Sequence, residues 1–486
     1  MPNNFAQFVI DSNQSRLDKI ALVDEEASLT YRDLANHIRS FGYHLQQSGV
    51  QPQNRVIISM EDCVAWPVAF LSILAVGGNP VLVGDDLPMS IVEKVCKIAD
   101  AKFVIGKEIA YLTCFHKQTI QAGLEHQLTD FYQYHPDEIC FWLLSSGTTG
   151  EPKCVVHRHS DLKTLLDVIA WPAYQIDKNS RILSTAKLSF TYGFNNSLTF
   201  GLGMGSTVYL INGVPAPTKV YQLVNEKQIT HLFTVPTVIN SMIKHGADQT
   251  LSTSVKVMVS SGEPLPASVA TQFQQRHDIT ILDGLGMSEC MYNYCTTTLE
   301  NNEFGTIGRP VAGVECKVCD DFGNTTPVGM VGEMWVKHPC AALQYWKDWN
   351  NTKTTFIGEW IKTGDKVIQQ PNGNYLYVSR KDDLIKINGQ FVSPTEIENV
   401  VLALDWVVDC GVVADLGEKG LYEIHAFITT KRPATSQELK SALANTLPSY
   451  KVPKYVHFID FIPKTVTGKK TRAVLRHKIN AYLEKL

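Results

Sequence analysis

One run of eleven residues constrains this chain more than any other: Leu143-Leu144-Ser145-Ser146-Gly147-Thr148-Thr149-Gly150-Glu151-Pro152-Lys153. It follows an apolar segment at 139–144 that is typical of a buried strand. Glycines let the backbone approach a ligand closely, hydroxyls and backbone N–H groups bind phosphate oxygens, and lysine adds positive charge. The run predicts a polyphosphate-binding loop, although a Ser/Gly/Thr-rich surface loop would have a similar composition. It is not a Walker loop, because two residues rather than four separate Gly147 from Gly150.

Strand-like and helix-like segments alternate through the first three quarters of the chain. The apolar strand-like runs lie at 55–60, 102–105, 206–211 and 256–260. The amphipathic helix-like stretches lie at 30–47, 217–227 and 236–245. This alternation predicts an α/β fold in which a large N-terminal domain is built on mostly parallel sheets.

The pattern changes after Gly305. Short strand-like runs at 316–319, 332–336 and 375–378 are separated by Asp/Asn/Gly turns, which predicts a small antiparallel, barrel-like region. From about residue 383 the pattern is mixed again. Helices are expected at 394–404 and 436–447, and strands at 407–413, 422–429 and 455–461. We therefore expect a small α+β domain at the C-terminal end.

Composition excludes several classes of function. The 44 basic and 48 acidic side chains give a net charge of −4, so no basic surface for nucleic acid is expected. The N-terminus has no basic stretch before an apolar core, which argues against a secretory signal. The most apolar region, 64–83, is interrupted by prolines and glycines, so we expect a buried helix and strand and no membrane span.

Cysteine usage fits a reducing compartment. The eleven cysteines are an odd number without a disulfide framework, so we expect reduced thiols in a cytoplasmic protein. Cys316 and Cys319 have the spacing of a metal or redox pair. No second pair lies near them and the segment reads as a strand, so we expect neither role there.

Five further polar motifs follow the first in order along the chain. They are Ser260-Ser261-Gly262-Glu263-Pro264-Leu265-Pro266, Asp283-Gly284-Leu285-Gly286-Met287-Ser288-Glu289, Trp360-Ile361-Lys362-Thr363-Gly364-Asp365, Tyr377-Val378-Ser379-Arg380-Lys381-Asp382-Asp383-Leu384-Ile385-Lys386 and Pro463-Lys464-Thr465-Val466-Thr467-Gly468-Lys469-Lys470-Thr471-Arg472. The first two follow strand-like runs, where open α/β sheets bind ligands. Each motif alone could be a turn or a charged surface. The occurrence of all of them in this order along one chain is a much more specific sign of function.

Together these motifs resemble those of the adenylate-forming enzymes, which are the acyl- and aryl-CoA ligases, the luciferases and the adenylation domains of peptide synthetases. The motif style is most similar to that of benzoate–CoA ligases. The resemblance runs from about residue 29 to residue 472. It implies an ATP- and acid-binding domain over 1–381 and a mobile C-terminal domain over 382–486. Two positions depart from the usual pattern: Leu285 stands where many relatives have Tyr, and Ser379 stands where they usually have Gly.

The resemblance assigns ATP contacts to most of these motifs. In it Asp365 binds both ribose hydroxyls, and Arg380 contacts ribose or phosphate. The implied ATP-binding residues are Ser145, Ser146, Gly147, Thr149, Gly150, Lys153, Ser261, Gly262, Glu263, Pro264, Asp283, Gly284, Leu285, Gly286, Met287, Ser288, Asp365, Tyr377, Arg380 and Lys386.

Three residues are implied to take part in catalysis: Lys469, Glu289 and Thr148. A carboxylate near a triphosphate would be repelled unless it held Mg²⁺, so we assign Mg²⁺ to Glu289, with Thr148 as a second ligand. Charge that develops between a carboxylate and a phosphate needs a placed cation. Lys470 is an alternative to Lys469, and we favour Lys469 because it directly follows Gly468.

The segment 187–201 is the best indication of the acid. It contains no Asp or Glu, and a buried ammonium without a partner is costly, so an amino acid is disfavoured. The string Phe190-Thr191-Tyr192-Gly193 lies within an aromatic stretch that resembles benzoate–CoA ligases and favours a planar aromatic acid, although these rings could equally belong to the core. The implied acid pocket consists of Phe190, Thr191, Tyr192, Gly193, Ser260 and Gly284.

The expected reaction has two halves. ATP and the acid first form an acyl-adenylate. The C-terminal domain then turns about Asp382, and a loop around Gly389 helps to form a tunnel for the thiol of coenzyme A. The alternative acceptor is the phosphopantetheine arm of a carrier protein supplied in trans. A third possibility is a nucleotide-binding regulatory protein on a decayed enzyme fold, which the intact motifs argue against. The sequence does not identify the acid, the oligomeric state or the pathway.

Overall fold

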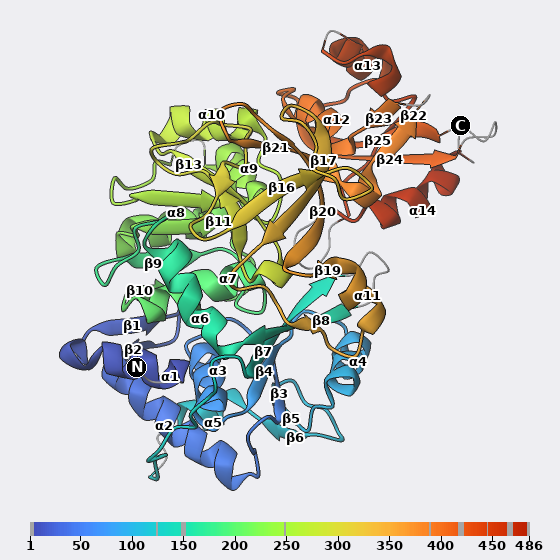
Figure 1. Cartoon of the computed structure of the whole chain (residues 1–486). Coiled ribbons are helices and arrows are strands. Elements are labelled where there is room, and N and C mark those ends of the chain that lie inside the picture. The colour runs from blue at the N-terminus through green and yellow to red at the C-terminus, as the bar shows by residue number, and fades with distance from the viewer. Residues whose placement is uncertain are drawn as a thin grey trace. The chain divides into compact units, whose positions relative to one another are not determined.

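The computed structural model describes residues 4–122, 125–146, 152–246, 249–387, 390–416, 422–444, 446–463 and 470–483. The chain divides into two compact units (Figure 1). Unit 1 comprises Met1–Leu265, Ala270–Cys316 and Trp335–Thr363, and unit 2 comprises Pro266–Val269, Lys317–Met334 and Gly364–Leu486. The domain boundary expected between residues 381 and 382 stays a prediction.

Unit 1 contains a nine-stranded sheet with the order β15-β14-β13-β12-β11-β9-β10-β1-β2. Strands β1 and β9–β13 run parallel, whereas β2, β14 and β15 pair with their neighbours in antiparallel fashion. The strands are β1 (Ile20–Val23), β2 (Ser28–Thr30), β9 (Arg181–Ser184), β10 (Thr207–Tyr209), β11 (His231–Thr234), β12 (Val257–Ser260), β13 (Ile281–Gly286), β14 (Asn293–Thr296) and β15 (Arg309–Pro310).

A seven-stranded sheet in the same unit has the order β18-β8-β7-β4-β3-β5-β6. Its strands β3 to β7 are parallel, and β8 and β18 extend the sheet in antiparallel fashion beyond β7. The strands are β3 (Arg55–Ser59), β4 (Asn79–Leu82), β5 (Phe103–Gly106), β6 (Thr113–Phe115), β7 (Ile139–Ser146), β8 (Pro152–Arg158) and β18 (Gln344–Tyr345). The prediction of an α/β fold with mostly parallel sheets is confirmed.

The parallel strands are rich in apolar residues, as is expected of strands that are covered on both faces. Every residue of β4, β11 and β12 is buried. A strand with one face in water would instead alternate apolar and polar residues. This burial explains why the strand-like runs could be found from composition alone.

Helices flank these sheets. Before residue 364 they are α1 (Phe5–Ser12), α2 (Tyr31–Gln47), α3 (Ala65–Ala75), α4 (Met89–Ala99), α5 (Lys117–Gln121), α6 (His159–Leu165), α7 (Thr191–Phe194), α8 (Pro217–Lys227), α9 (Pro236–His245), α10 (Ala267–His277) and α11 (Trp349–Thr355). The predicted bounds of α8 and α9 are confirmed, and each begins with a proline, whose fixed φ suits the first helical turn.

The first long helix shows how local sequence sets these elements. Thr30 Oγ1 accepts from the N–H of Asp33, and the Asp33 carboxylate accepts from the N–H of Thr30, so a capping box starts α2. Its apolar face lies along α3 (Figure 1). All residues of α3 are buried, as is expected of a helix that is apolar all round.

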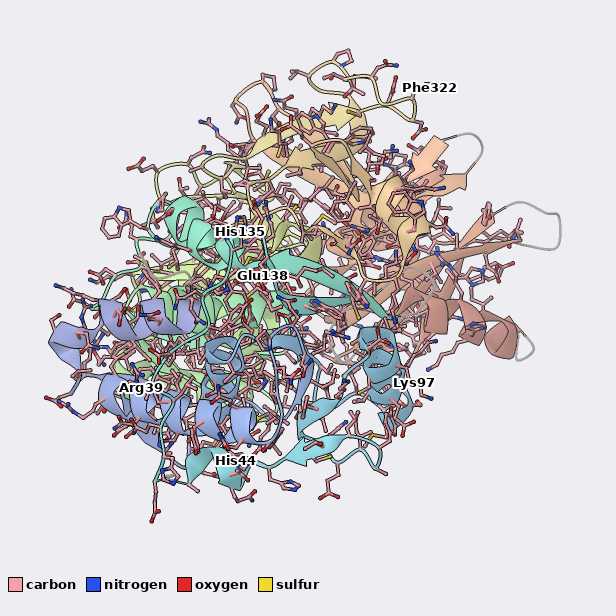
Figure 2. The ribbon with its side chains drawn as sticks, turned by 60° about the horizontal axis from the view of Figure 1, so that its bottom comes forward. Arg39, His44, Lys97, His135, Glu138 and Phe322 are labelled. Atoms are coloured by element: carbon pink, nitrogen blue, oxygen red, sulfur yellow. The ribbon has the colours of Figure 1, made fainter. Side chains whose placement is uncertain are left out.

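A five-stranded sheet follows, with the order β16-β17-β20-β19, and β21 also pairs with β20. The strands are β16 (Glu315–Cys319), β17 (Val331–Lys337), β19 (Phe356–Ile357), β20 (Trp360–Gln369) and β21 (Tyr375–Arg380). The pairs β19–β20 and β20–β21 are antiparallel, as expected. In the predicted turn after β16, Asp320 Oδ1 accepts from the N–H groups of Phe322 and Asn324, and Phe322 is 92% exposed and points away from the ribbon (Figure 2).

The motif Trp360–Asp365, which taken alone could be a turn, lies inside β20, and Gly364 is an interior residue of that strand. Gly364 has a φ of +71°, and a Cβ at this position would lie 2.9 Å from Arg380 Nη2. The glycine therefore lets β20 pass closely beside the arginine of β21 without ending the strand.

The C-terminal part of unit 2 has the predicted α+β character. Strands β22 (Ile385–Ile387) and β23 (Gln390–Val392) form a hairpin-like pair, and β24 (Val407–Leu416), β25 (Tyr422–Thr430) and β26 (Tyr455–Phe458) form a three-stranded sheet. Helices α12 (Pro394–Leu402) and α13 (Ser436–Ala444) contribute to the apolar core on one face of this sheet, and α14 (Arg472–Leu483) packs on the other.

In the parts of the chain that the structure describes, no helix combines the length and the apolar character needed to cross a bilayer.

Two buried histidines form a hydrogen bond inside the C-terminal sheet. His425 Nδ1 and His457 Nε2 are 3.0 Å apart on the parallel strands β25 and β26. Burial, followed by repulsion from His457, lowers the pKa of His425 to about 4. Burial also lowers the pKa of His457. The unfolded chain therefore binds more protons than the folded chain between about pH 6.5 and pH 4, and stability falls as the pH falls through this range.

Substitution His457→Gln should make unfolding less dependent on pH in this range. Between pH 7 and pH 5 the free energy of unfolding should fall more steeply in wild type than in the variant. The two slopes should differ by up to about 1.4 kcal/mol per pH unit, the value for one proton. Denaturant titrations of both proteins at several pH values measure the two slopes. Above pH 7 the difference between the proteins should be constant, and parallel curves down to pH 5 would contradict the prediction.

Candidate active site

Several predicted site residues lie at the carboxyl edge of the nine-stranded sheet. Ser260, the last residue of β12, lies opposite Asp283 of β13 and opposite Thr234 of β11. Ligands of open α/β sheets bind at this edge. Ser260 Oγ is buried, and within the described parts of the chain it has no hydrogen-bond partner. A buried hydroxyl of this kind is available to a bound ligand.

The segment Asp283–Gly286 belongs to β13, whereas the sequence predicts that the strand ends before it. The strand continues because Gly284 and Leu285 pair with Thr296 and Cys295 of β14. A Cβ on Gly284 would lie 2.2 Å from Asn293 Nδ2, so only glycine permits this packing. Burial raises the pKa of the Asp283 carboxyl well above its usual range.

The turn after β12 has both buried and exposed residues. Ser261 is buried, with Oγ 3.0 Å from the carbonyl oxygen of Gly284. Glu263 Oε2 accepts a hydrogen bond of 2.8 Å from Thr237, whereas Gly262 and Pro264 are exposed. The predicted ATP contacts of this motif therefore lie beside those of the β13 motif.

The two ends of the predicted phosphate loop are the ends of paired strands. Ser145 and Ser146 close β7, Lys153 lies near the start of β8, and Ser145 faces Lys153 in the antiparallel register. The Lys153 ammonium lies 4.8 Å from the centre of the Tyr345 ring. The central loop residues Gly147, Thr148, Thr149 and Gly150 lie outside the described residues.

The turn that carries Ser288 and Glu289 is held from three sides. Thr191 Oγ1 lies 2.8 Å from Ser288 Oγ, and His157 Nε2 donates to the Ser288 carbonyl oxygen over 2.8 Å. The N–H of Ala342 donates to the Glu289 carbonyl oxygen, also over 2.8 Å. These contacts come from α7, β8 and the chain before β18, so the turn is fixed by distant parts of unit 1.

The Glu289 carboxylate is buried and faces the phosphate loop. Tyr345 donates to Glu289 Oε1 over 2.6 Å, and Ser145 Oγ lies 3.5 Å from the same oxygen. A buried ionised carboxylate needs hydrogen bonds or a cation. In the described part of the chain these partners use only Oε1, so Oε2 is available to a cation.

Sequence reasoning missed two residues of this arrangement, Tyr345 and His157. The ring of His157 is fully buried, with Nδ1 3.1 Å from Asp161 Oδ2 and Nε2 on Ser288. Asp161 is held in turn by Arg158, whose Nη2 lies 3.0 Å from its Oδ1. The only local sign is the spacing of four between His157 and Asp161, which is too common to indicate a site.

The aromatic segment 187–194 is anchored at its start by carboxylates from other loops. Lys187 forms ion pairs of 2.7 Å with Asp85 and 3.1 Å with Asp86. The N–H of Leu188 donates to Asp62 over 2.9 Å, and burial raises the pKa of Asp62 to about 7. These contacts hold the segment against the loops that follow β3 and β4 of the seven-stranded sheet.

Both the hydroxyl and the ring of Tyr192 have partners in unit 1. The hydroxyl donates to the Val259 carbonyl oxygen over 3.0 Å, and the ring stacks on Tyr292 with 5.6 Å between ring centres. Burial raises the pKa of Tyr192 well above its usual range. Of the predicted pocket residues, Thr191 contacts the Ser288 turn, and the Tyr192 hydroxyl bonds to Val259, which precedes Ser260 in β12. Phe190 is partly buried directly before α7, and Gly193 lies within α7.

In unit 2 the structure brings together the two predicted ribose contacts. Asp365 and Arg380 lie opposite each other on β20 and β21, and Arg380 Nη1 is 3.0 Å from Asp365 Oδ1. Tyr377 also lies on β21, and burial raises the pKa of its hydroxyl. Asp382 lies in a short 3-10 turn, Lys381–Asp383.

Other predicted residues have less structural detail. The backbone of Lys386 lies in β22. Gly389 and Lys469 lie outside the described residues. Lys470, the alternative to Lys469, lies 3.4 Å from Glu398 Oε2 and 3.6 Å from Asp409 Oδ1.

The described residues contain no cluster of three or more His, Cys, Asp or Glu side chains that could hold a metal ion by themselves. Cys316 and Cys319 lie three apart on β16 and therefore point to opposite faces. Cys316 instead lies 3.9 Å from Cys295, measured between sulfurs. The two thiols of this pair do not converge on one point.

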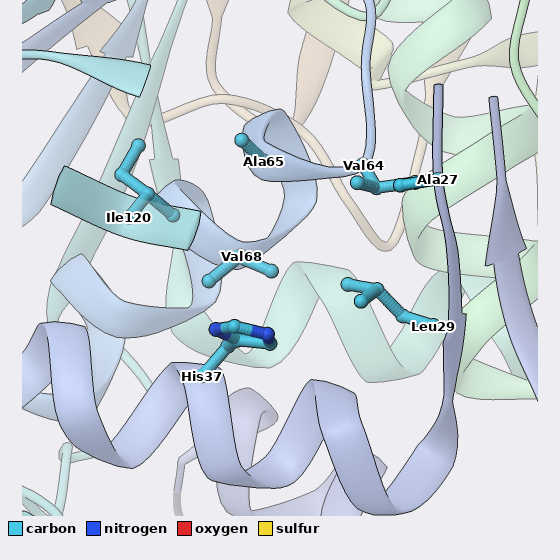
Figure 3. Close-up of a pocket in the computed structure, with 7 residues that line it drawn as sticks. All are labelled: Ala27, Leu29, His37, Val64, Ala65, Val68 and Ile120. Atoms are coloured by element: carbon cyan, nitrogen blue, oxygen red, sulfur yellow. The ribbon is translucent and has the colours of Figure 1, made fainter. Parts of the chain in front are cut away.

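A small hollow of about 160 Å³ lies away from these groups (Figure 3). His37 of α2 and apolar side chains line it, namely Ala27, Leu29, Val64, Ala65, Val68 and Ile120. None of the residues predicted to bind ATP or the acid is among them.

Comparison with known proteins agrees with this geometry. The family model described as "AMP-binding enzyme" matches residues 10–346, and the model described as "AMP-binding enzyme C-terminal domain" matches residues 396–469. The benzoate–CoA ligase of Thauera aromatica is 33% identical, over 94% of this chain and 92% of that protein.

Solved structures show the same fold. A benzoate CoA ligase from Burkholderia xenovorans LB400 superposes with a TM-score of 0.90 at 33% identity, covering 97% of this chain and 99% of that one. An anthranilate CoA ligase in complex with anthranoyl-AMP superposes with a TM-score of 0.93 at 26% identity, covering 98% of each chain. The matches to both family models, with relatives similar over nearly their full length, establish that this chain belongs to the AMP-binding enzyme family.

Proposed function

We propose that this protein activates an aromatic carboxylic acid with ATP and transfers the acyl group to coenzyme A. One observation carries the proposal. In the Ser288–Glu289 turn, the Glu289 carboxylate lies near Ser145, at the start of the predicted phosphate loop. The neighbouring Ser288 hydroxyl contacts Thr191 of the aromatic segment. Groups suited to a phosphate and to an aromatic acid therefore meet at one turn, where a carboxylate and the α-phosphate would react.

In the first half-reaction a carboxylate oxygen of the acid attacks the α-phosphorus of ATP. The bond between the α-phosphorus and the bridging oxygen breaks, and pyrophosphate leaves. Ser145, Thr149 and Lys153 would bind the departing phosphates, with the hydroxyl and ammonium groups as hydrogen-bond donors. Asp365 would accept hydrogen bonds from the ribose hydroxyls, and Arg380, its ion-pair partner, would contact ribose or phosphate.

The donor set around Glu289 fits a Mg²⁺ ion. Its buried carboxylate receives hydrogen bonds only from neutral hydroxyls in the described part of the chain, so its negative charge is not neutralised there. Glu289 and Thr148 would hold the ion, which when bound would neutralise phosphate charge. The protein residues around the ion would then have to keep Glu289 in place and to exclude water from the carboxylate of the acid substrate.

Several contacts favour an aromatic acid. The Tyr192 ring is fixed by its hydrogen bond to Val259 and by stacking on Tyr292, so it can provide a flat apolar surface. The aspartates that lie near the start of the segment are engaged by Lys187 and by the Leu188 N–H. The benzoate–CoA ligase and anthranilate–CoA ligase relatives act on aromatic acids by name, which supports the same substrate class here.

In the second half-reaction the thiol of coenzyme A attacks the carbonyl carbon of the acyl-adenylate, and AMP leaves as the C–O bond to its phosphate breaks. A turn of the C-terminal domain about Asp382 would withdraw Lys469 and bring the Gly389 loop to the thiol. The names of the similar ligases favour coenzyme A over a carrier-protein arm. The eleven cysteines are all free thiols, which fits a reaction carried out in the cytoplasm.

The surroundings of Lys470 support Lys469 as the catalytic lysine. Lys470 lies within reach of two carboxylates, Glu398 and Asp409, which raise its pKa against the effect of burial. A lysine committed to these partners is poorly placed to leave them for a substrate. The neighbouring lysine is the better candidate for the cation that spans carboxylate and phosphate.

ATP–pyrophosphate exchange should depend on an aromatic acid without an α-amine. We expect benzoate or a hydroxybenzoate to give kcat/KM values on the order of 100-fold above that of phenylalanine, because the ammonium group would be buried without a carboxylate partner. A screen of benzoates, cinnamates, short fatty acids and amino acids measures this ratio. Holo carrier protein and coenzyme A are then compared as acceptors with the best acid, and coenzyme A should be acylated. The absence of exchange with every acid would contradict the proposed function.

Substitutions Lys469→Ala and Lys470→Ala should separate the two lysines. Lys469→Ala should reduce adenylate formation by about 100-fold or more while thioester formation from supplied acyl-adenylate and coenzyme A continues. Lys470→Ala should lower the thermal stability, because it leaves Glu398 and Asp409 without one of their cations, and should change adenylation only a few-fold. For both variants, ATP–pyrophosphate exchange measures adenylate formation, a thioester assay measures the second half-reaction, and thermal melts measure stability. Equal loss of both half-reactions in Lys469→Ala would count against the assignment.

A further inference from the structure

One tyrosine contacts two groups of opposite charge in the candidate site. The Tyr345 hydroxyl lies 2.6 Å from Glu289 Oε1, and the face of the same ring lies 4.8 Å from the Lys153 ammonium. We propose that Tyr345 is a positioning residue: its hydroxyl orients the Glu289 carboxylate for a divalent cation, and its ring keeps Lys153 apart from that carboxylate. This inference rests on the proposed function, which gives Glu289 the cation and Lys153 the phosphates.

Tyr345 is itself held firmly. It is buried on the short strand β18, where it pairs with Val155 of β8. Its N–H donates to Thr352 Oγ1 over 3.1 Å, and its ring packs edge to face on Phe356 with 5.6 Å between ring centres. With backbone and ring both fixed, the hydroxyl has a defined position. A fixed donor is what orienting a carboxylate requires, because a mobile donor would follow the carboxylate without directing it.

The hydroxyl sets the direction of the Glu289 carboxylate. A carboxylate oxygen only accepts, so the Tyr345 O–H donates, and the short distance is typical of a bond to a charged acceptor. The other neighbour of Oε1, Ser145 Oγ, is 3.5 Å away and holds it weakly. With Oε1 held by the phenol, Oε2 is the oxygen that remains for a cation. Without the phenol the carboxylate could rotate, and the cation site would lose its preset geometry.

The ring keeps two opposite charges from pairing. Within the described parts of the chain, the Lys153 ammonium lies over the Tyr345 ring and forms no hydrogen bond and no ion pair, with Glu289 or with any other residue. An aromatic face attracts an ammonium by its quadrupole but leaves the charge available to an arriving phosphate. A direct ion pair between Lys153 and Glu289 would neutralise both groups, and in this buried setting it would be hard to break. Tyr345 therefore keeps one group available for phosphate and the other for a cation.

Two substitutions separate the roles of hydroxyl and ring. Tyr345→Phe removes the hydroxyl and keeps the ring, so the concentration of Mg²⁺ that gives half-maximal exchange should rise about tenfold, while KM for ATP at saturating Mg²⁺ stays within about twofold. Tyr345→Leu removes both features, so the Mg²⁺ requirement and KM for ATP should both rise. KM for the acid should stay within about twofold in Tyr345→Phe, because the substitution does not touch the aromatic segment.

Binding without turnover gives a second measurement. Mn²⁺ serves as a spectroscopic probe, and the electron paramagnetic resonance signal of the free ion is titrated with each protein in the presence of a non-hydrolysable ATP analogue. Tyr345→Phe should bind Mn²⁺ about tenfold more weakly than wild type. Phe356→Leu is the matched control, because it disturbs the packing of the same ring from outside the site. It should change the affinity for Mn²⁺ by no more than about twofold, because the hydroxyl is kept and the pairing of β18 with β8 still holds the backbone of Tyr345.

Glu289→Gln distinguishes failure of this inference from failure of the proposed function. If Glu289→Gln weakens Mn²⁺ binding and Tyr345→Phe does not, the role of Tyr345 is wrong and the role of Glu289 stands. If Glu289→Gln leaves Mn²⁺ binding unchanged, the assignment of the cation to Glu289 fails and the inference fails with it. If Tyr345→Phe and Phe356→Leu weaken Mn²⁺ binding equally, Tyr345 acts only through packing and the inference is overturned. Thermal melts establish that each variant is folded.

Discussion

The carboxylate of Glu289 connects the two large sheets of unit 1. It follows β13 of the nine-stranded sheet, whereas its partners Ser145 and Tyr345 lie on β7 and β18 of the seven-stranded sheet. Because a buried charge is costly unless it is hydrogen-bonded or neutralised, these partners have to stay in place. The hydrogen bonds that stabilise the buried Glu289 carboxylate therefore also hold the edges of the two sheets together at the site.

The turn that carries Glu289 is also held by hydrogen bonds to its backbone. His157 and Ala342 donate to successive carbonyl oxygens, those of Ser288 and Glu289. His157 is held by Asp161, and Asp161 by Arg158, so the support extends into the start of α6. Because the carbonyl groups also fix the turn, its side chains do not have to hold it alone, and Glu289 Oε2 stays available for a ligand. This division between supporting backbone and reacting side chains suits a site that has to be ready before substrates bind.

Local sequence predicted the elements whose signals are local. Helices α8 and α9 begin at prolines, and β4 and β12 lie in the apolar regions 64–83 and 256–260, so these elements could be predicted directly. The end of β13 and the middle of β20 could not be predicted in this way. Asp283–Gly286 and Gly364 have the composition of turns, and only pairing with β14 and β21 keeps them in strands.

The candidate site shows the same limit. The motifs identified Ser145, Ser288 and Glu289 in sequence, and these residues do converge on one turn. Tyr345 and Glu289 are 56 positions apart, and His157 and Ser288 are 131 apart. No pattern along the chain links such pairs, since each contact depends on which strands lie next to each other. The residues that position a site are for this reason harder to predict than the residues that act in it.

Unit 2 has its own anchoring side chain, and it bears on the proposed domain motion. Arg472 Nη1 lies 2.9 Å from Asp383, next to the proposed hinge, and Nη2 lies 2.9 Å from Glu398 of α12. Glu398 also accepts from the N–H of Val412 in β24 and lies near Lys470. These contacts tie the segment after the hinge, the C-terminal sheet and the chain that follows Lys469 to one another. Because the links are charged and partly buried, bending between these parts would leave charges unpaired. A rotation at the proposed hinge, Asp382, would therefore carry Lys470 and Arg472 together with the C-terminal sheet.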